Sequence, residues 1–202
     1  MKRQYTFSLF VAMFLILAGA VIAGSGKSGN ASMAPAIGAT VEDFTLPDTD
    51  GKSHSLSSLK GKNGAVVIFI SVQCPISNAY NERMAKLAED YGARGISVIG
   101  INSNKSESAD VVKAHAAEKH LTFTILKDPG NKIADLLGAQ HTPEAYYLDT
   151  NNKLLYHGRI DNSTDTAKVE SNDLRDALDS ALAGKPIQKT TSLAFGCSIK
   201  RV

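Results

Sequence analysis

The chain has 202 residues, of which 43% are hydrophobic and 21% charged, and its formal net charge is +2. A chain of this length and composition fits one compact domain with a full-sized core. Its lysines and arginines are scattered among aspartates and glutamates, which excludes the basic stripe that a nucleic-acid-binding protein needs to neutralise phosphates.

Residues 1–23 have the pattern of a secretory signal peptide. Two basic residues precede an uncharged, mostly apolar run over residues 5–22, and Ala23 supplies a small residue at the position that a signal peptidase reads. We therefore expect export to the periplasm or the cell exterior. One alternative stays open, because an uncleaved run of about 18 apolar residues is long enough to anchor the protein in a membrane. No other membrane contact is expected.

The cysteine count is informative for an exported protein. Only Cys74 and Cys197 are present, so the chain forms at most one internal disulfide. Small secreted domains that depend on disulfides for stability usually contain four or more cysteines. We infer that the core holds itself together and that the two thiols are available for redox chemistry.

The predicted organisation is a flexible Gly/Ser-rich linker over residues 24–37, a domain over residues 38–184 and a tail over residues 185–202. The tail is too polar to be core, and it either docks on the domain or is mobile. Within the domain, an N-terminal β-hairpin comes first, and alternating βα units, a second hairpin and a last helix follow. The expected strands cover residues 41–46, 53–56, 65–72, 96–101, 122–126, 144–148 and 154–160, and the expected helices cover residues 76–91, 106–120, 132–137 and 172–182. This order predicts an α/β fold, with a central mixed β-sheet flanked by helices on both faces.

Cys74 is the strongest functional signal. It follows a predicted central strand and opens a predicted helix, where unpaired backbone N–H groups and the helix dipole stabilise a negative charge. Such a position lowers a thiol pKa and raises its reactivity. Pro75 suits the first helical turn, where its missing N–H costs nothing. The alternative is that Cys74 is a small buried hydrophobic residue.

Four segments carry a resemblance to a known group of proteins. They are residues 41–48, residues 74–77 (Cys-Pro-Ile-Ser), Thr142-Pro143 with the strand that follows, and residues 158–161 (Gly-Arg-Ile-Asp). In this order and spacing the chain resembles the thioredoxin-like superfamily over residues 38–184, in particular the exported redoxins and the thiol-specific antioxidant (AhpC/TSA) family. The resemblance implies a thioredoxin-like fold.

The resemblance also implies roles for particular residues. Pro143 would be cis and pack against Cys74, leaving the Thr142 backbone open to pair with a bound peptide; the alternative is a trans proline that starts an edge strand. Ser77 stands where thioredoxins have a second cysteine, so no disulfide forms within the motif. Cys74 is then resolved by Cys197, by an external thiol, or not at all, and Cys197 has a structural disulfide as its alternative role.

Further residues are weaker candidates. Ser71 matches the hydroxyl residue that peroxiredoxins carry ahead of the reactive cysteine, and Arg159 is a candidate for their arginine, but Val67 replaces their proline. His141 is a candidate base or soft-metal ligand, with an exposed loop histidine as the alternative, and Glu144 is a candidate proton acceptor. No metal site is predicted, because one histidine and one cysteine are too few ligands.

These observations predict an extracytoplasmic thiol–disulfide oxidoreductase. Cys74 would attack as a thiolate, with Thr142, Pro75 and Ser77 as binding residues, and Cys197 or an external thiol would complete the cycle. Its expected partners are protein or small-molecule thiols and disulfides, with hydroperoxides as further candidates, and no organic cofactor is implied. The alternatives are a peroxiredoxin-type thiol peroxidase and a non-catalytic thiol- or metal-binding module of the same fold.

Overall fold

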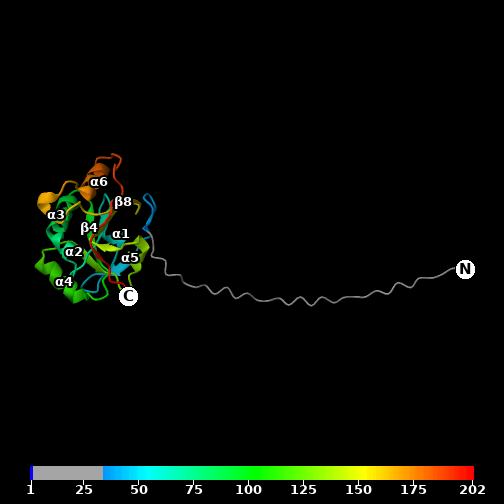
Figure 1. Ribbon diagram of the computed structural model, residues 1–202, viewed down its shortest axis with the longest axis horizontal. Helices are drawn as coiled ribbons and strands as arrows, with labels where there is room; N and C mark the ends of the chain where they lie inside the picture. The colour runs from blue at the N-terminus through cyan, green and yellow to red at the C-terminus, as the bar shows by residue number, and fades with distance from the viewer. Residues whose placement is uncertain (2–33) are drawn as a thin grey trace. The chain divides into compact units, whose positions relative to one another are not determined.

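The computed structural model describes Met1 and residues 34–202 (Figure 1). The predicted signal peptide and most of the predicted linker lie outside the described residues. Within the described part, no helix is long and apolar enough to cross a bilayer. Gly38 contacts the domain through its amide, which donates a 2.7 Å hydrogen bond to the Leu154 carbonyl.

A five-stranded mixed sheet forms the centre of the fold, in the order β5-β4-β3-β7-β8. Strands β3 (Ala65–Phe69), β4 (Ser97–Asn102) and β5 (Thr124–Lys127) are parallel, while β7 (Glu144–Leu148) and β8 (Leu154–Gly158) form an antiparallel hairpin beside β3. All five residues of β3 are buried, as expected for an uninterrupted apolar strand covered on both faces. The predicted thioredoxin-like α/β fold is confirmed.

Helices cover both faces of this sheet (Figure 1). Helices α3 (Asn81–Gly92), α4 (Ala109–Glu118) and α6 (Asp173–Leu182) pack on the face that holds Val66 and Ile68. Helices α1 (Leu56–Leu59) and α5 (Lys132–Leu137) pack on the face that holds Val67 and Phe69. The alternation of side chains along β3 therefore divides the core into two clusters, one on each side.

The N-terminal hairpin is confirmed in a shorter form. Strands β1 (Thr45–Pro47) and β2 (Ser53–Ser55) pair antiparallel. The short helix α1 follows directly and was not predicted. Ser55 begins it with a capping box. The Ser55 hydroxyl oxygen accepts a hydrogen bond from the Ser58 amide, and the Ser58 hydroxyl oxygen accepts one from the Ser55 amide.

The helix expected over residues 76–91 is divided into α2 (Pro75–Ala79) and α3. Tyr80 lies between them with φ −101° and ψ −3°, and its hydroxyl donates a 2.8 Å hydrogen bond to the Asp161 carboxylate. The apolar spacing could not reveal this break, because Ile76, Tyr80 and Met84 all contact the same core cluster.

The C-terminal tail is docked, which settles the alternative that the sequence left open. After the 3₁₀ turn Thr166–Lys168 and helix α6, residues 190–192 run beside β8, where the His157 amide donates to the Thr190 carbonyl at 3.0 Å. Strand β9 (Cys197–Ser198) then pairs antiparallel with β6 (His141–Thr142). Ile199 is buried in the core, and the chain ends beside α5 (Figure 1).

Candidate functional site

Cys74 is the N-cap residue of α2, as the sequence predicted. Its backbone is extended, with φ −84° and ψ 113°, and its sulfur accepts a 3.3 Å hydrogen bond from the Ser77 amide. Pro75 occupies the first helical turn. The side chain that opens this helix is thus a sulfur where an oxygen-bearing residue is usual, and a backbone N–H points at it.

Thr142, which precedes Pro143, lies against the same sulfur. The peptide bond between them is cis, as the resemblance implied. The Thr142 carbonyl accepts a 3.2 Å hydrogen bond from the Cys74 thiol. The residue before the cis proline therefore contacts Cys74.

Cys197 is brought to Cys74 by the pairing of two short strands. In the register of β6 and β9, Cys197 lies opposite Thr142. Both cysteines are free thiols, both line the same small cavity, and each shifts the pKa of the other. The sequence left the position of Cys197 open, and the structure places it beside Cys74.

The two thiols differ in acidity. Burial raises the pKa of Cys74, but the neighbouring Cys197, the Ser77 amide and Thr142 lower it by more, so its pKa lies below the ordinary thiol value. The bond to the Thr142 carbonyl acts the other way, since only the protonated sulfur can make it. Burial and the neighbouring Cys74 raise the pKa of Cys197. Cys74 is therefore the sulfur that ionises first.

A buried carboxylate, Glu107, fixes the loop that leads to Cys74. Its side chain accepts hydrogen bonds from the Ser71 hydroxyl at 2.7 Å and from the Val72 and Gln73 amides at 3.0 Å each. The Ser71 oxygen in turn accepts the Cys74 amide at 3.2 Å. Glu107 is only 2% exposed, and sequence analysis did not identify it, because it precedes α4 without any motif.

Glu107 is ionised although it is buried. Burial raises its pKa, but the hydrogen bonds from Ser71, Gln73, Val72 and Asn102 lower it by more, so the net pKa is below the ordinary value. Its backbone carbonyl also accepts a 2.6 Å hydrogen bond from the Lys127 ammonium, whose own pKa is lowered by burial. A satisfied carboxylate of this kind is rigid, and it holds the Cys74 loop in one conformation.

Glu144 and Arg159 are engaged with residues other than Cys74. The buried Glu144 carboxylate accepts four hydrogen bonds, which leaves no strong acceptor site free for a thiol proton. Arg159 pairs with the Asp173 carboxylate and lies 3.3 Å from the Ser171 hydroxyl. The four donors to Glu144 are the amides of Gln140 and His141, the Tyr146 hydroxyl and the His157 ring.

His141 lies beside Glu144 at the edge of the site. Its side chain is 37% exposed, and its Nδ1 is 3.9 Å from the Glu144 carboxylate. Among residues 34–202, no group of three histidine, cysteine, aspartate or glutamate side chains is arranged to hold a metal ion. The described part of the chain thus offers His141 no set of partner ligands.

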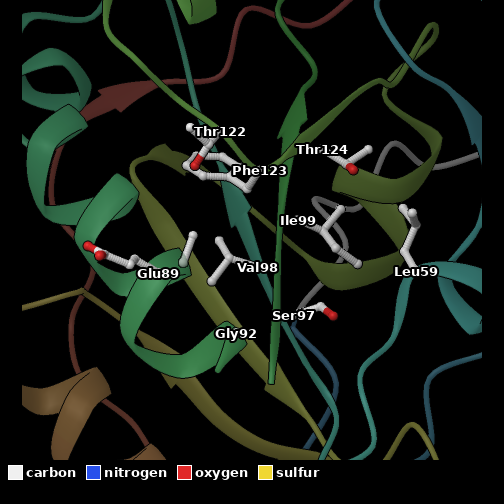
Figure 2. Close-up of a pocket in the computed structure, with 10 residues that line it drawn as sticks. Leu59, Glu89, Gly92, Ser97, Val98, Ile99, Thr122, Phe123 and Thr124 are labelled. Atoms are coloured by element: carbon white, nitrogen blue, oxygen red, sulfur yellow. The ribbon is translucent and has the colours of Figure 1, made fainter. Parts of the chain in front are cut away.

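A small cavity of about 180 Å³ borders the cysteines. A larger hollow of about 370 Å³ lies between α3 and the first residues of β4 and β5 (Figure 2). Ser97 in that hollow pairs with Ala65 at the start of β3, whereas Cys74 follows the other end of β3, so the two cavities are at opposite ends of the sheet. The small cavity is lined by Ser71, Gln73, Cys74, Asn104, Glu107, Cys197, Ser198 and Lys200.

Comparisons with known proteins agree with this geometry. The model of the AhpC/TSA family matches residues 37–157. A chloroplastic peroxiredoxin Q from Sedum lineare is 34% identical over 132 residues, which cover 61% of this chain and 69% of that protein. Other chloroplastic peroxiredoxin Q proteins are matched over less than two thirds of their length, for example 62% in Suaeda salsa. The thiol-disulfide oxidoreductase ResA of Geobacillus thermodenitrificans is 26% identical over 76% of this chain and 86% of its own.

Among solved structures, a hypothetical protein from Sinorhizobium meliloti superposes with a TM-score of 0.78 and 34% identity, covering 85% of this chain and 97% of that one. The family match spans more than half of the chain and includes β3, Cys74 and the segment with the cis proline. The chain therefore belongs to the AhpC/TSA family of thiol-dependent redox proteins.

Proposed function

We propose that this protein is an extracytoplasmic thiol–disulfide oxidoreductase that cycles Cys74 and Cys197 between two thiols and one disulfide. The observation that carries the proposal is the placement of the two cysteines: Cys197 lies opposite Thr142, whose carbonyl accepts the Cys74 thiol, and both cysteines line one small cavity. The signal-peptide pattern of residues 1–23 supports an exported location, where such disulfides persist. The similarity to a protein named thiol-disulfide oxidoreductase supports the reaction class.

The cycle needs two exchange steps. In the first, the Cys74 thiolate attacks one sulfur of a substrate disulfide, so that a mixed disulfide forms and one substrate thiolate leaves. In the second, Cys197 loses its proton to solvent and attacks the Cys74 sulfur, which releases the second substrate thiolate. Two electrons pass from the cysteine pair to the substrate, and an external thiol that reduces the Cys74–Cys197 disulfide restores the dithiol.

The neighbouring residues position and stabilise the attacking sulfur. The Ser77 amide donates to it, Pro75 starts α2 without an N–H, and the Thr142 carbonyl before the cis Pro143 contacts it. Glu107 acts one step away, as a positioning residue, because it holds the loop over residues 71–73 and leaves the Ser71 oxygen facing the Cys74 amide.

A second candidate reaction is the reduction of hydroperoxides, favoured by the small cavity at Cys74 and by the similarity to peroxiredoxin Q. The Cys74 thiolate would attack the peroxide, take one oxygen as a sulfenic acid and release an alcohol or water. Cys197 would then condense with the sulfenic acid, which forms the disulfide and releases water. Ser71 and Arg159 would serve this reaction less directly, since Ser71 donates to Glu107 and Arg159 pairs with Asp173.

The first prediction concerns the disulfide. Mild oxidation of the reduced protein should join Cys74 to Cys197 within one chain, because both cysteines line the same small cavity. Mass spectrometry of peptides from the oxidised protein identifies the pair. Cys197→Ser should instead leave Cys74 as a sulfenic acid or a mixed disulfide, whereas the control Ser198→Ala should still form the bond. Oxidation that yields only disulfide-linked dimers, or no bond at all, contradicts the proposed cycle.

The second prediction concerns Glu107. Glu107→Gln replaces one acceptor oxygen by an NH2 donor that faces other donors, so the free energy of unfolding of the reduced protein at neutral pH should fall by roughly 1–3 kcal/mol. The pKa of Glu107 is lowered in the folded state, so its stabilisation is present above the ordinary value of 4.5 and is lost as the pH falls below it. The difference from the wild type should therefore shrink in acid.

Denaturant unfolding at neutral and acidic pH measures this difference. Glu89→Gln is the matched control, because Glu89 is a surface residue whose side chain is 72% exposed, and its replacement should change stability by about 0.5 kcal/mol or less. The positioning role is wrong if Glu107→Gln behaves like this control or if its effect does not depend on pH.

The third prediction separates the two candidate reactions. If the protein is a peroxidase, one equivalent of hydrogen peroxide should convert the reduced protein to the Cys74–Cys197 disulfide within seconds, and a thiol donor should sustain turnover. Stopped-flow measurement of peroxide loss gives the rate constant. A rate constant no greater than that of the Cys74→Ser variant eliminates the peroxidase reaction and leaves disulfide exchange.

A further inference from the structure

The tail pairs with the backbone of β6, the short strand beside Cys74. In the register of β6 and β9, His141 pairs with Ser198 and Thr142 pairs with Cys197. The Ile199 amide extends the pairing with a 3.0 Å hydrogen bond to the Gln140 carbonyl. An extended peptide that bound at Thr142 would need these same backbone groups, because strand addition uses the unpaired edge of the receiving strand.

Gly196 brings the tail into close contact with this edge. A Cβ atom at Gly196 would lie 2.1 Å from the Thr142 carbonyl oxygen and 2.7 Å from its carbon. Only a residue without a side chain allows two backbones to approach so closely. The tail and Thr142 therefore leave no space between them for another strand.

The tail is fixed on both sides of β9. Before it, the Ser192 amide donates to the His157 carbonyl at 3.1 Å, and the Phe195 ring packs edge-on against Tyr80. After it, the Lys200 amide donates to the Asn104 side chain at 2.6 Å, and the Val202 amide donates to the Asn131 side chain at 2.9 Å. These anchors come from separate parts of the domain, so the tail is held along most of its length.

The remaining approach to Cys74 is narrow. The residue is 2% exposed, and the cavity at its sulfur has a volume of about 180 Å³. Pockets that hold drug-sized ligands begin at roughly 300 Å³. Gln73, Asn104 and Lys200 are among the residues that line the cavity.

We propose that residues 190–202 act as a tethered strand that occupies the backbone edge of β6, where an extended peptide would otherwise pair with Thr142. Cys74 then reacts directly with small disulfides and hydroperoxides and not with disulfides of polypeptides. This inference rests on the proposed redox cycle and names its substrate class. In the exchange step, the Cys74 thiolate forms the new S–S bond while the thiolate of the small disulfide leaves.

The test compares two reagents that release the same leaving group. Cys197→Ser leaves Cys74 as the single thiol, and its reaction is followed with 2,2′-dithiodipyridine and with a ten-residue peptide whose one cysteine carries a pyridyl disulfide. Each reaction forms a mixed disulfide and releases thiopyridone, which absorbance records. With the tail in place, the peptide should react at least ~10-fold more slowly than the small reagent.

Gly196→Ala, added to Cys197→Ser, should displace the tail while keeping every other tail residue. The ratio of the small-reagent rate to the peptide rate should fall ~10-fold, because the peptide can then pair with the Thr142 backbone. Gly92→Ala is the matched control, since a Cβ there meets no atom within 4 Å, and it should leave the ratio unchanged. A chain that ends at Ser198, which removes the later anchors, gives a second route to the displaced tail if Gly196→Ala does not fold.

The proposal is overturned if the peptide reacts as fast as the small reagent with the tail in place, or if neither displaced form lowers the ratio. Failure of the redox cycle has a different signature, because the wild-type protein would then form no Cys74–Cys197 disulfide on oxidation. The two outcomes are independent, since the rate ratio is measured without Cys197.

Discussion

The Cys74 sulfur lies at the start of α2, enclosed by three segments of the chain that are distant in sequence. Burial by itself would keep it protonated, because removal from water disfavours the charged form. The Ser77 amide donates a hydrogen bond to it, and this bond and the neighbouring Cys197 lower its pKa despite burial. The reactivity of the site depends on this balance, which in turn requires the loop fixed by Glu107 and the strand pairing that places Cys197.

The parts of the fold that could be predicted have local signals. The uninterrupted apolar run identified β3, and the change from strand to helix at Cys74-Pro75 identified the N-cap position. Thr142-Pro143 before a strand identified the cis peptide bond through the resemblance. Each of these signals lies within a few residues of the feature that it predicts, and this proximity is why sequence analysis found it.

The features that sequence analysis missed depend on contacts between distant residues. Glu107 is 36 positions from Ser71, and only the folded sheet brings its carboxylate under the Cys74 loop. Tyr80, at the break between α2 and α3, hydrogen-bonds Asp161, which is 81 positions away. The docking of the tail requires the edge of β6, which is two residues long and has no propensity signature of its own. The sequence identified Cys197 but could not place it.

The pH dependence of alkylation at each cysteine tests the central claim most directly. The reduced wild-type protein is treated with iodoacetamide over a range of pH, and mass spectrometry follows the two cysteine peptides separately. The account predicts that Cys74 reaches half of its maximal rate below the ordinary pKa of a thiol and that Cys197 does so above it. A Cys74 that titrates at or above the ordinary value, or that reacts more slowly than Cys197 at neutral pH, would contradict the account.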